Sequence, residues 1–324
     1  MEKVTAKEFL GEALGTFILV FFGLGSVAVE VATDITLGLP VIALIWGAAV
    51  ALAIQICGPL SGAHINSAMT LAFATWTDFS WRKVPGYLSA QFLGAMLGAL
   101  AVYALFSGAI SDFEASNGII RGKAGSEASA KIFGEFYQSP LLKAFIWEGS
   151  GTFFLAFGVF WLIGKTKQSR LKKWLPLMIG LWLAVLIWLV APVTQAGFNP
   201  ARDLGPRIIT ALLGWDTWSF EANGWGFLLV YVIAPCLGAL LGGSIRFGAL
   251  TTLIMFSTVW WATVRVTAEQ RALDVRQVPP RTMPLMGETL RIGAFNIAHG
   301  RGSELGKSNW DGGTPEERLS LIHI

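Results

Sequence analysis

Six long apolar runs restrict this 324-residue chain to a helical, membrane-spanning fold. They lie near residues 9–29, 38–57, 85–106, 142–164, 174–191 and 225–245. Each run is long enough to cross about 30 Å of hydrocarbon as a helix. Of all residues, 54% are hydrophobic and only 14% are charged, whereas soluble domains carry about 25% charged residues. The chain is therefore predicted to be an all-α integral membrane protein.

The polar composition excludes several other classes of protein. A net charge of +3 is too small to indicate nucleic-acid binding. Cys57 and Cys236 both lie in apolar runs, so no disulfide framework is expected. His64, His299 and His323 are too few and too scattered for a metal site, and no cofactor is expected. The first apolar run has no small-residue cleavage site behind it, so it indicates a span rather than a signal peptide.

Two polar segments, residues 58–68 and 191–202, interrupt the apolar pattern in corresponding places. Each contains a Pro, a hydroxyl residue two positions later, and an Asn-x-Ala tripeptide that begins at Asn66 or Asn199. Asn is a good helix N-cap, so each tripeptide predicts a helix start. The apolar stretches that follow, 68–75 and 201–213, are too short to span and predict two half-helices.

The two halves of the chain repeat with opposite orientation. The sequence EALGTF at residues 12–17 matches EGSGTF at residues 148–153. Three spans per half is an odd number, so the halves form an inverted repeat. Three clusters of basic residues fall on one side of the six-span arrangement, and that side is predicted to be cytoplasmic, with the N-terminus. These residues are Lys3, Lys7, Arg82, Lys83, Lys165, Lys167, Arg170, Lys172 and Lys173.

Inverted half-helices meet with their N-termini facing each other near the middle of the membrane. Each N-terminus carries about half a positive charge, so the pair repels cations. Each Asn amide has an N–H for a solute oxygen, and the carbonyls of residues 60–65 and 193–198 are expected to line the path as acceptors. This arrangement favours a neutral solute with hydroxyl groups.

On these motifs, the chain resembles the major intrinsic protein family, the aquaporins and glycerol facilitators, over residues 1–247. Segments 61–66 (SGAHIN) and 199–206 (NPARDLGP) are close to the two family signatures. The resemblance implies six spans plus two re-entrant half-helices in an aquaporin-like fold. It also implies a homotetramer with one pore in each subunit.

Several residues of this chain match positions that line the pore in the family. Arg202 resembles the constriction arginine, and counting from Asn66 and Asn199 gives Trp46, Ile187 and Ala196 as its companions. Water-selective members usually carry His where this chain has Ile187. The apolar Ile187 and small Ala196 imply a wider constriction, similar to that of glycerol facilitators, and Asp203 points the same way.

Other matched residues support the loops. Glu12 and Glu148 resemble the buried glutamates that accept N–H groups from the two loops, and His64 is expected to fix its own loop. The half-helix starts are Ser67, Ala68, Pro200 and Ala201. Two residues depart from the family pattern. Ser67 stands in place of Pro, which is expected to loosen the first half-helix, and Gln195 replaces Gly and is expected to intrude on its loop.

Other interpretations of these residues remain open. Trp46 is compatible with an interfacial or packed aromatic, and Arg202 with a simple pair to Asp203. Inverted repeats also occur in alternating-access secondary transporters. The function expected is passive conduction of glycerol, with water also permeant and urea, ammonia and metalloid acids as further solutes. No enzymatic activity is expected, and the predicted location is the cell inner (plasma) membrane.

Residues 248–324 differ in character from the rest of the chain. An apolar stretch, 249–264, is followed by a Pro- and Arg-rich linker over 271–284. Residues 290–300 (LRIGAFNIAHG) resemble the first strand of the endonuclease/exonuclease/phosphatase superfamily. No downstream metal ligand or catalytic His follows, so the alternative of a membrane-anchored phosphodiesterase is not expected to be active. The final LSLIHI resembles translated sequencing-adapter sequence, which suggests a read-through tail.

Overall fold

Within the described residues, six helical segments of the computed structural model are long and apolar enough to cross a membrane. The structure describes residues 3–166 and 170–244. The six segments are Ala6–Ala32, Gly38–Ser61, Trp81–Ser116, Leu141–Thr166, Arg170–Thr194 and Gly226–Ser244. Each lies over one of the predicted runs, so the six-span prediction is confirmed. The predicted tail from residue 248 onward lies outside the described residues.

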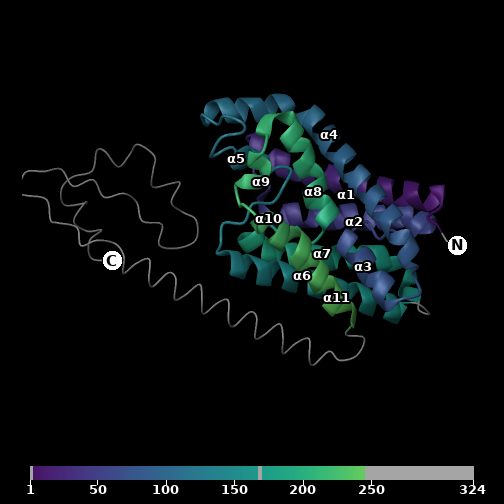
Figure 1. Cartoon of the computed structure of the whole chain (residues 1–324). Helices are drawn as coiled ribbons and strands as arrows, with labels where there is room; N and C mark the ends of the chain where they lie inside the picture. Colours follow the sequence, from purple (N-terminus) through teal and green to yellow (C-terminus); the bar gives the residue numbers. More distant parts are fainter. Residues whose placement is uncertain (1–2, 167–169, 245–324) are drawn as a thin grey trace, which may run out of the picture. The chain divides into compact units, whose positions relative to one another are not determined.

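The helices of the described part follow the repeat seen in the sequence (Figure 1). They are α1 (Ala6–Ala32), α2 (Gly38–Ser61), α3 (Ser67–Trp76), α4 (Val84–Ser116), α5 (Glu127–Ala130), α6 (Leu141–Thr166), α7 (Leu175–Thr194), α8 (Pro200–Thr210), α9 (Trp218–Glu221), α10 (Gly226–Leu228) and α11 (Ala234–Ser244). A π-helical turn, Leu229–Ile233, joins α10 to α11 and completes the sixth span.

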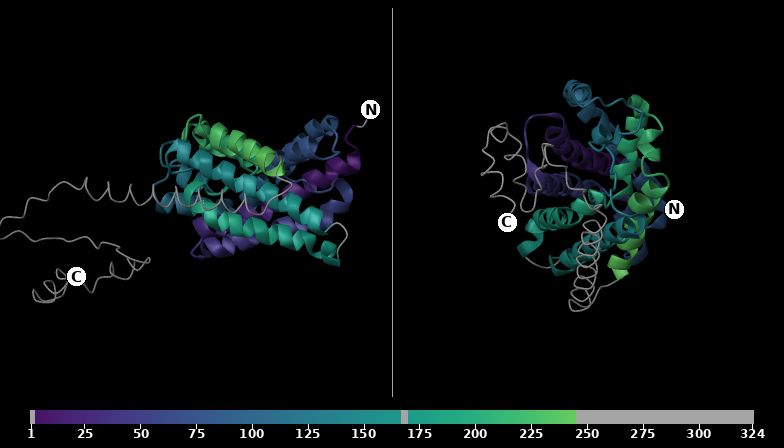
Figure 2. Two further views of the ribbon diagram at one scale, coloured as in Figure 1. Left: turned by 90° about the horizontal axis from the view of Figure 1, so that it is seen from below. Right: turned by 90° about the vertical axis from the view of Figure 1, so that its left-hand side faces the viewer.

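The packing of the helices shows the inverted repeat in three dimensions. Helix α1 packs against α2 and α4, and its counterpart α6 packs against α7 and α11. Each half-helix crosses into the other half, because α3 packs on α11 and α8 packs on α4. In the left-hand view of Figure 2, the long helices run side by side along the length of the bundle. In Figure 1, α3 lies toward the end that carries the N-terminus, and α5, α9 and α10 lie at the opposite end.

Close helix contacts depend on glycine at two corresponding positions. A methyl group on Gly94 of α4 would collide with the carbonyl of Ala13 in α1. In the second half, a methyl group on Gly238 of α11 would collide with the carbonyl of Gly149 in α6. Small residues allow membrane helices to approach at backbone distance, and here they bring α4 and α11 close enough to hold the half-helices.

Both half-helices begin where the Asn residues predict. The side-chain oxygen of Asn66 accepts the N–H of Ala68 at 2.9 Å and caps α3. Asn199 likewise accepts the N–H of Ala201 at 3.1 Å and caps α8. The preceding prolines do not end the spans, since α2 continues through Pro59 to Ser61 and α7 continues to Thr194. The irregular loops are therefore shorter than expected, covering residues 62–66 and 195–199.

Candidate functional site

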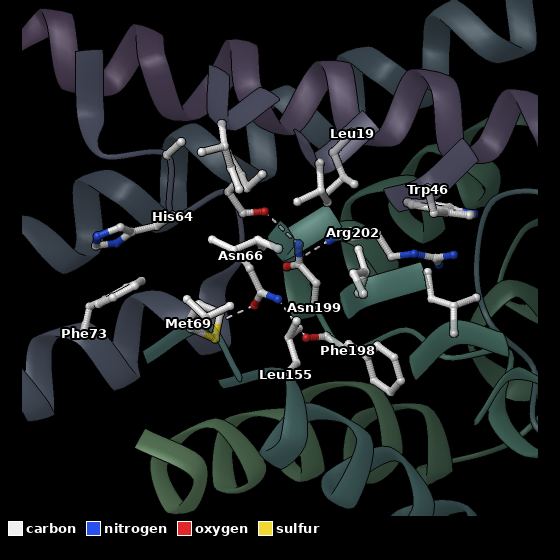
Figure 3. A pocket seen from close by; sticks show the side chains of 18 of the residues that line it. Leu19, Trp46, His64, Asn66, Met69, Phe73, Leu155, Phe198, Asn199 and Arg202 are labelled. Carbon is white, nitrogen blue, oxygen red and sulfur yellow. Dashed lines mark hydrogen bonds between the residues drawn. The ribbon is translucent and has the colours of Figure 1, made fainter. Parts of the chain in front are cut away.

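A cavity runs past the point where the two half-helices meet (Figure 3). Asn66 and Asn199 lie together at its middle, Trp46 and Arg202 toward one end, and His64 toward the other. All of the residues predicted to line a pore are in its wall: Trp46, Asn66, Ile187, Ala196, Asn199 and Arg202. The structure thus brings together positions that lie up to 156 residues apart in the sequence, counted from Trp46 to Arg202.

The two loops bond reciprocally through their Asn side chains. The Nδ2 amide of Asn66 donates to the carbonyl of Phe198 at 2.9 Å, and that of Asn199 donates to the carbonyl of Ile65 at 2.8 Å. Each amide carries two N–H groups, so these bonds leave a second donor on each. The carbonyls of Ile65 and Phe198, two of those expected to line the path, therefore each accept one hydrogen bond within the protein and keep a second lone pair.

The loops adopt a backbone that L-residues rarely accept. The φ angles of Ala63 and Ile65 are 51° and 44°, and those of Gln195, Ala196 and Phe198 are 65°, 62° and 53°. Such left-handed conformations cost about 1–3 kcal/mol each outside glycine. They persist only where surrounding contacts hold them, so the loops need firm partners on the adjacent helices.

Glu12 of α1 is the partner of the first loop. Its carboxylate accepts the backbone N–H groups of His64 at 2.9 Å and Ile65 at 2.7 Å. The Ser61 hydroxyl and the Gln91 amide also donate to it, each at 2.7 Å. Glu12 is fully buried, and its four donors stabilise a charge that a membrane interior otherwise disfavours.

Glu148 and His64 occupy the other supporting positions. Glu148 of α6 accepts the backbone N–H of Phe198 at 2.5 Å, the counterpart of the bond from Ile65 to Glu12. The His64 ring stacks on Phe73 with centroids 4.5 Å apart, and its Nδ1 lies 3.3 Å from the Thr70 hydroxyl. These contacts agree with loop support, the role expected for both residues.

Ser67, the departure at the start of α3, is well bonded. Its hydroxyl donates to Oε1 of Gln91 at 3.0 Å, and its backbone N–H donates to Oδ1 of Asn199 at 3.3 Å. Gln91 in turn donates to Glu12 and, at 2.9 Å, to Thr70. The expected loosening of the first half-helix is therefore not what the structure shows. Ser67 links that helix to α4 and to the opposite loop.

Arg202 lies toward one end of the cavity, beside Trp46. Its guanidinium carbon is 4.3 Å from the centroid of the Trp46 ring (Figure 3). Nη2 of Arg202 pairs with the carboxylate of Glu135, not with Asp203. Nη1 is buried and has no hydrogen-bond partner in the described structure. Trp46 is 4% exposed, so it is a buried wall residue and not an interfacial aromatic.

No motif in the sequence located Glu135 or the hydrogen-bond network behind it. Asp203 accepts the Glu135 backbone N–H at 2.7 Å and pairs with Arg207 at 2.8 Å. Arg207 also donates to the Glu135 carbonyl at 2.5 Å. One signal was available in the sequence, because Glu135 is a carboxylate between Phe133 and Phe136. A charge among aromatics indicates a buried partner.

An apolar surface forms another part of the cavity wall. It comes from α1, α2, α6 and α7, and its residues are Leu19, Val50, Ile54, Leu155, Val159, Ile163, Ile179 and Leu183. Polar atoms come mainly from the loops and half-helix starts. A solute in this cavity therefore meets both hydrogen-bonding groups and an apolar surface.

Comparison with known proteins agrees with this geometry. The family described as "Major intrinsic protein" matches residues 1–246. The chain is 38% identical to the glycerol uptake facilitator protein of Pseudomonas aeruginosa over 72% of this chain and 85% of that protein. It is 34% identical to mouse Aquaporin-7 over 77% of this chain and 82% of that protein.

A solved structure extends the agreement to the fold. The X-ray structure of the aquaglyceroporin from Plasmodium falciparum superimposes with a TM-score of 0.65 at 28% identity. The match covers 77% of this chain and 98% of that one. Six spans, two capped half-helices that meet at paired Asn residues, and these matches lead to one conclusion: the chain belongs to the major intrinsic protein family.

Proposed function

We propose that this protein is a passive channel for glycerol, through which water also passes. The pathway is the cavity lined by Trp46, Ile187, Ala196 and Arg202 at one end and by the Asn pair at its middle. Relatives named as a glycerol uptake facilitator and an aquaporin support this solute class.

The observation that carries the proposal is the free donor on Arg202 beside an apolar wall. Nη1 of Arg202 is buried without a protein partner, and leaving such a donor unsatisfied costs about 1–3 kcal/mol or more for a charged group. A solute hydroxyl can accept from this nitrogen while the solute carbons lie against the apolar wall of the cavity. Water satisfies the donor but uses none of the apolar surface.

The same site disfavours cations. The N-termini of α3 and α8 meet at the Asn pair, and each contributes about half a positive charge. Arg202 adds a full positive charge toward one end of the cavity. A hydrated cation would exchange its water shell for positive groups, whereas a neutral polyol would exchange hydration for donors and acceptors.

Proteoliposome swelling tests the proposal directly. Vesicles that contain the purified chain should take up glycerol down its gradient, without saturation at moderate concentrations and without dependence on Na⁺ or a proton gradient. Empty vesicles are the control. Saturable, ion-dependent uptake would favour the alternating-access transporter and contradict the channel.

Several finer points belong to the same proposal. We infer a homotetramer in the plasma membrane, with the N-terminus cytoplasmic and no enzymatic activity. The basic residues of one side support the orientation, and the N-terminus and α5 lie at opposite ends of the bundle. Urea, ammonia and metalloid acids are further candidate solutes, and a swelling assay with each would rank them.

The domain division is also part of the proposal. Residues 1–247 form the channel unit, and residues 248–324 are a read-through tail with no role in conduction. A stop codon near residue 248 in the resequenced native locus would support this division. An intact, longer fusion reading frame would contradict it.

A further inference from the structure

Gln195 occupies a position that its side chain makes costly. It ends α7 in the left-handed conformation with φ of 65°, where glycine is favoured and most other residues are strained. The expected intrusion of this side chain into the loop is not observed. Instead, Oε1 of Gln195 accepts the backbone N–H of Phe136 at 2.5 Å. The side chain is therefore bound to the segment that carries Glu135.

Two acceptors from either side of Asn199 hold consecutive N–H groups of this segment. Gln195, four residues before Asn199, takes the N–H of Phe136. Asp203, four residues after Asn199, takes the N–H of Glu135 at 2.7 Å. The geometry is that of a clamp, because two adjacent peptide groups are fixed by two separate side chains on the second loop and its half-helix.

The clamp directs the Glu135 carboxylate onto Arg202. The side chains of Arg202 and Glu135 are 6% and 4% exposed, so their pairing is screened little by solvent. Because Nη2 of Arg202 is bound to Glu135, the guanidinium plane is fixed and Nη1 is the donor left for a solute. If the Glu135 carboxylate is displaced, the guanidinium of Arg202 is free to rotate into the cavity.

We propose that Gln195 is a positioning residue for selectivity, which acts through Phe136 and Glu135 to set the orientation of the Arg202 donor. The inference rests on the proposed glycerol channel and deepens it. At a left-handed position that favours glycine, the Gln195 side chain makes a hydrogen bond that glycine cannot make.

The test is a double-mutant cycle with Gln195→Gly and Glu135→Gln, read as the ratio of glycerol to water permeability in proteoliposomes. Gln195→Gly suits the backbone angle, so the chain should fold, and thermal unfolding in detergent should be unchanged or raised. The lost hydrogen bond is worth about 1 kcal/mol. This energy corresponds to about a fivefold decrease in the ratio of glycerol to water permeability. Gln195→Asn, which tolerates the backbone angle but is too short to reach Phe136, should behave like glycine.

The cycle separates positioning from simple structural support. In the Glu135→Gln background, Gln195→Gly should change the ratio little further, because its effect passes through Glu135. An unchanged ratio in Gln195→Gly, or effects that multiply in the double variant, would overturn the inference while the wild type still conducts glycerol. Failure of the wild type itself to conduct glycerol would overturn the proposed function and the inference with it.

Discussion

The backbone N–H of Ser67 donates a hydrogen bond to Oδ1 of Asn199, at 3.3 Å, across the point where the two half-helices meet. The inverted repeat has no equivalent bond on the other side, because Pro200 occupies the matching position and has no N–H. Oδ1 of Asn199 therefore accepts from Ser67 as well as from Ala201 and Arg202 of its own helix. The two Asn residues are thus held unequally.

Replacing Ser67 separates the role of its N–H from that of its hydroxyl. Ser67→Ala removes the bond to Gln91 and should cost about 1 kcal/mol of stability. Ser67→Pro also removes the bond to Asn199. The rigidity of proline restricts the unfolded chain, however, and this offsets about 0.4–1 kcal/mol of the lost stability. We expect similar thermal unfolding for both, with glycerol flux lowered several-fold only in Ser67→Pro. Equal glycerol flux in the two variants would show that the bond to Asn199 does not orient its amide.

Ile187→His should convert the constriction toward water selectivity. Ile187 lines the cavity and is 6% exposed, so an imidazole there narrows the path and replaces apolar wall with a polar group. Glycerol flux should fall about tenfold or more and water flux much less, measured by swelling and by osmotic shrinkage of the same vesicles. Ile187→Leu is the matched control. If both fluxes fall equally in Ile187→His, the residue does not select between them.

Acidification should reduce the glycerol flux of the channel, because it protonates Glu135. Burial raises the pKa of the Glu135 carboxyl, against the opposing effect of the Arg202 guanidinium. Asp203 and Arg207 of α8, Glu148 of α6 and Tyr231 also surround it. As pH falls through this raised pKa, Glu135 becomes neutral and its ion pair with Arg202 is lost. Flux should fall toward that of Glu135→Gln.

The Glu135→Gln variant is the control for that pH dependence. Its glycerol flux should be low and nearly independent of pH over the same range. Protonation of Glu135 should lower the glycerol flux but raise the folding stability, because a carboxyl with a raised pKa favours the folded state when it is protonated. Unfolding through this group therefore does not explain a loss of flux in acid. A pH response that persists in Glu135→Gln would assign it to another residue.

Glu12→Gln should destabilise the protein strongly. An amide in place of the carboxylate directs N–H groups at donors from His64, Ile65 or Ser61, and each unsatisfied buried donor costs about 1–3 kcal/mol. Thermal unfolding in detergent should shift down by several degrees, with loss of flux. Glu8→Gln on the same helix is the control, since Gln preserves the cap at Thr5 and the Glu8–Lys83 pair is partly exposed. Equal shifts in both variants would contradict the role of Glu12.

Much of this protein follows from local patterns in its sequence. Apolar length alone predicts the spans, because backbone groups in lipid must be satisfied within a helix. Asn66 and Asn199 predict the starts of α3 and α8, because a cap bonds residues only two or three positions away. The repeat then predicts that these starts meet, and the family resemblance, counted from them, implies Trp46 and Arg202 as pore residues.

Only the tertiary structure decided which groups hold these residues in place. Glu135 lies 67 positions before Arg202, in a segment with no span or motif to locate it. Likewise, Ser67 and Gln195 depart from the family pattern in the sequence, and only the folded structure gives them partners, the side chain of Asn199 and the backbone N–H of Phe136. The reason is physical: caps and spans depend on neighbours along the chain, whereas ion pairs and loop clamps depend on distances that exist only after the helices have packed.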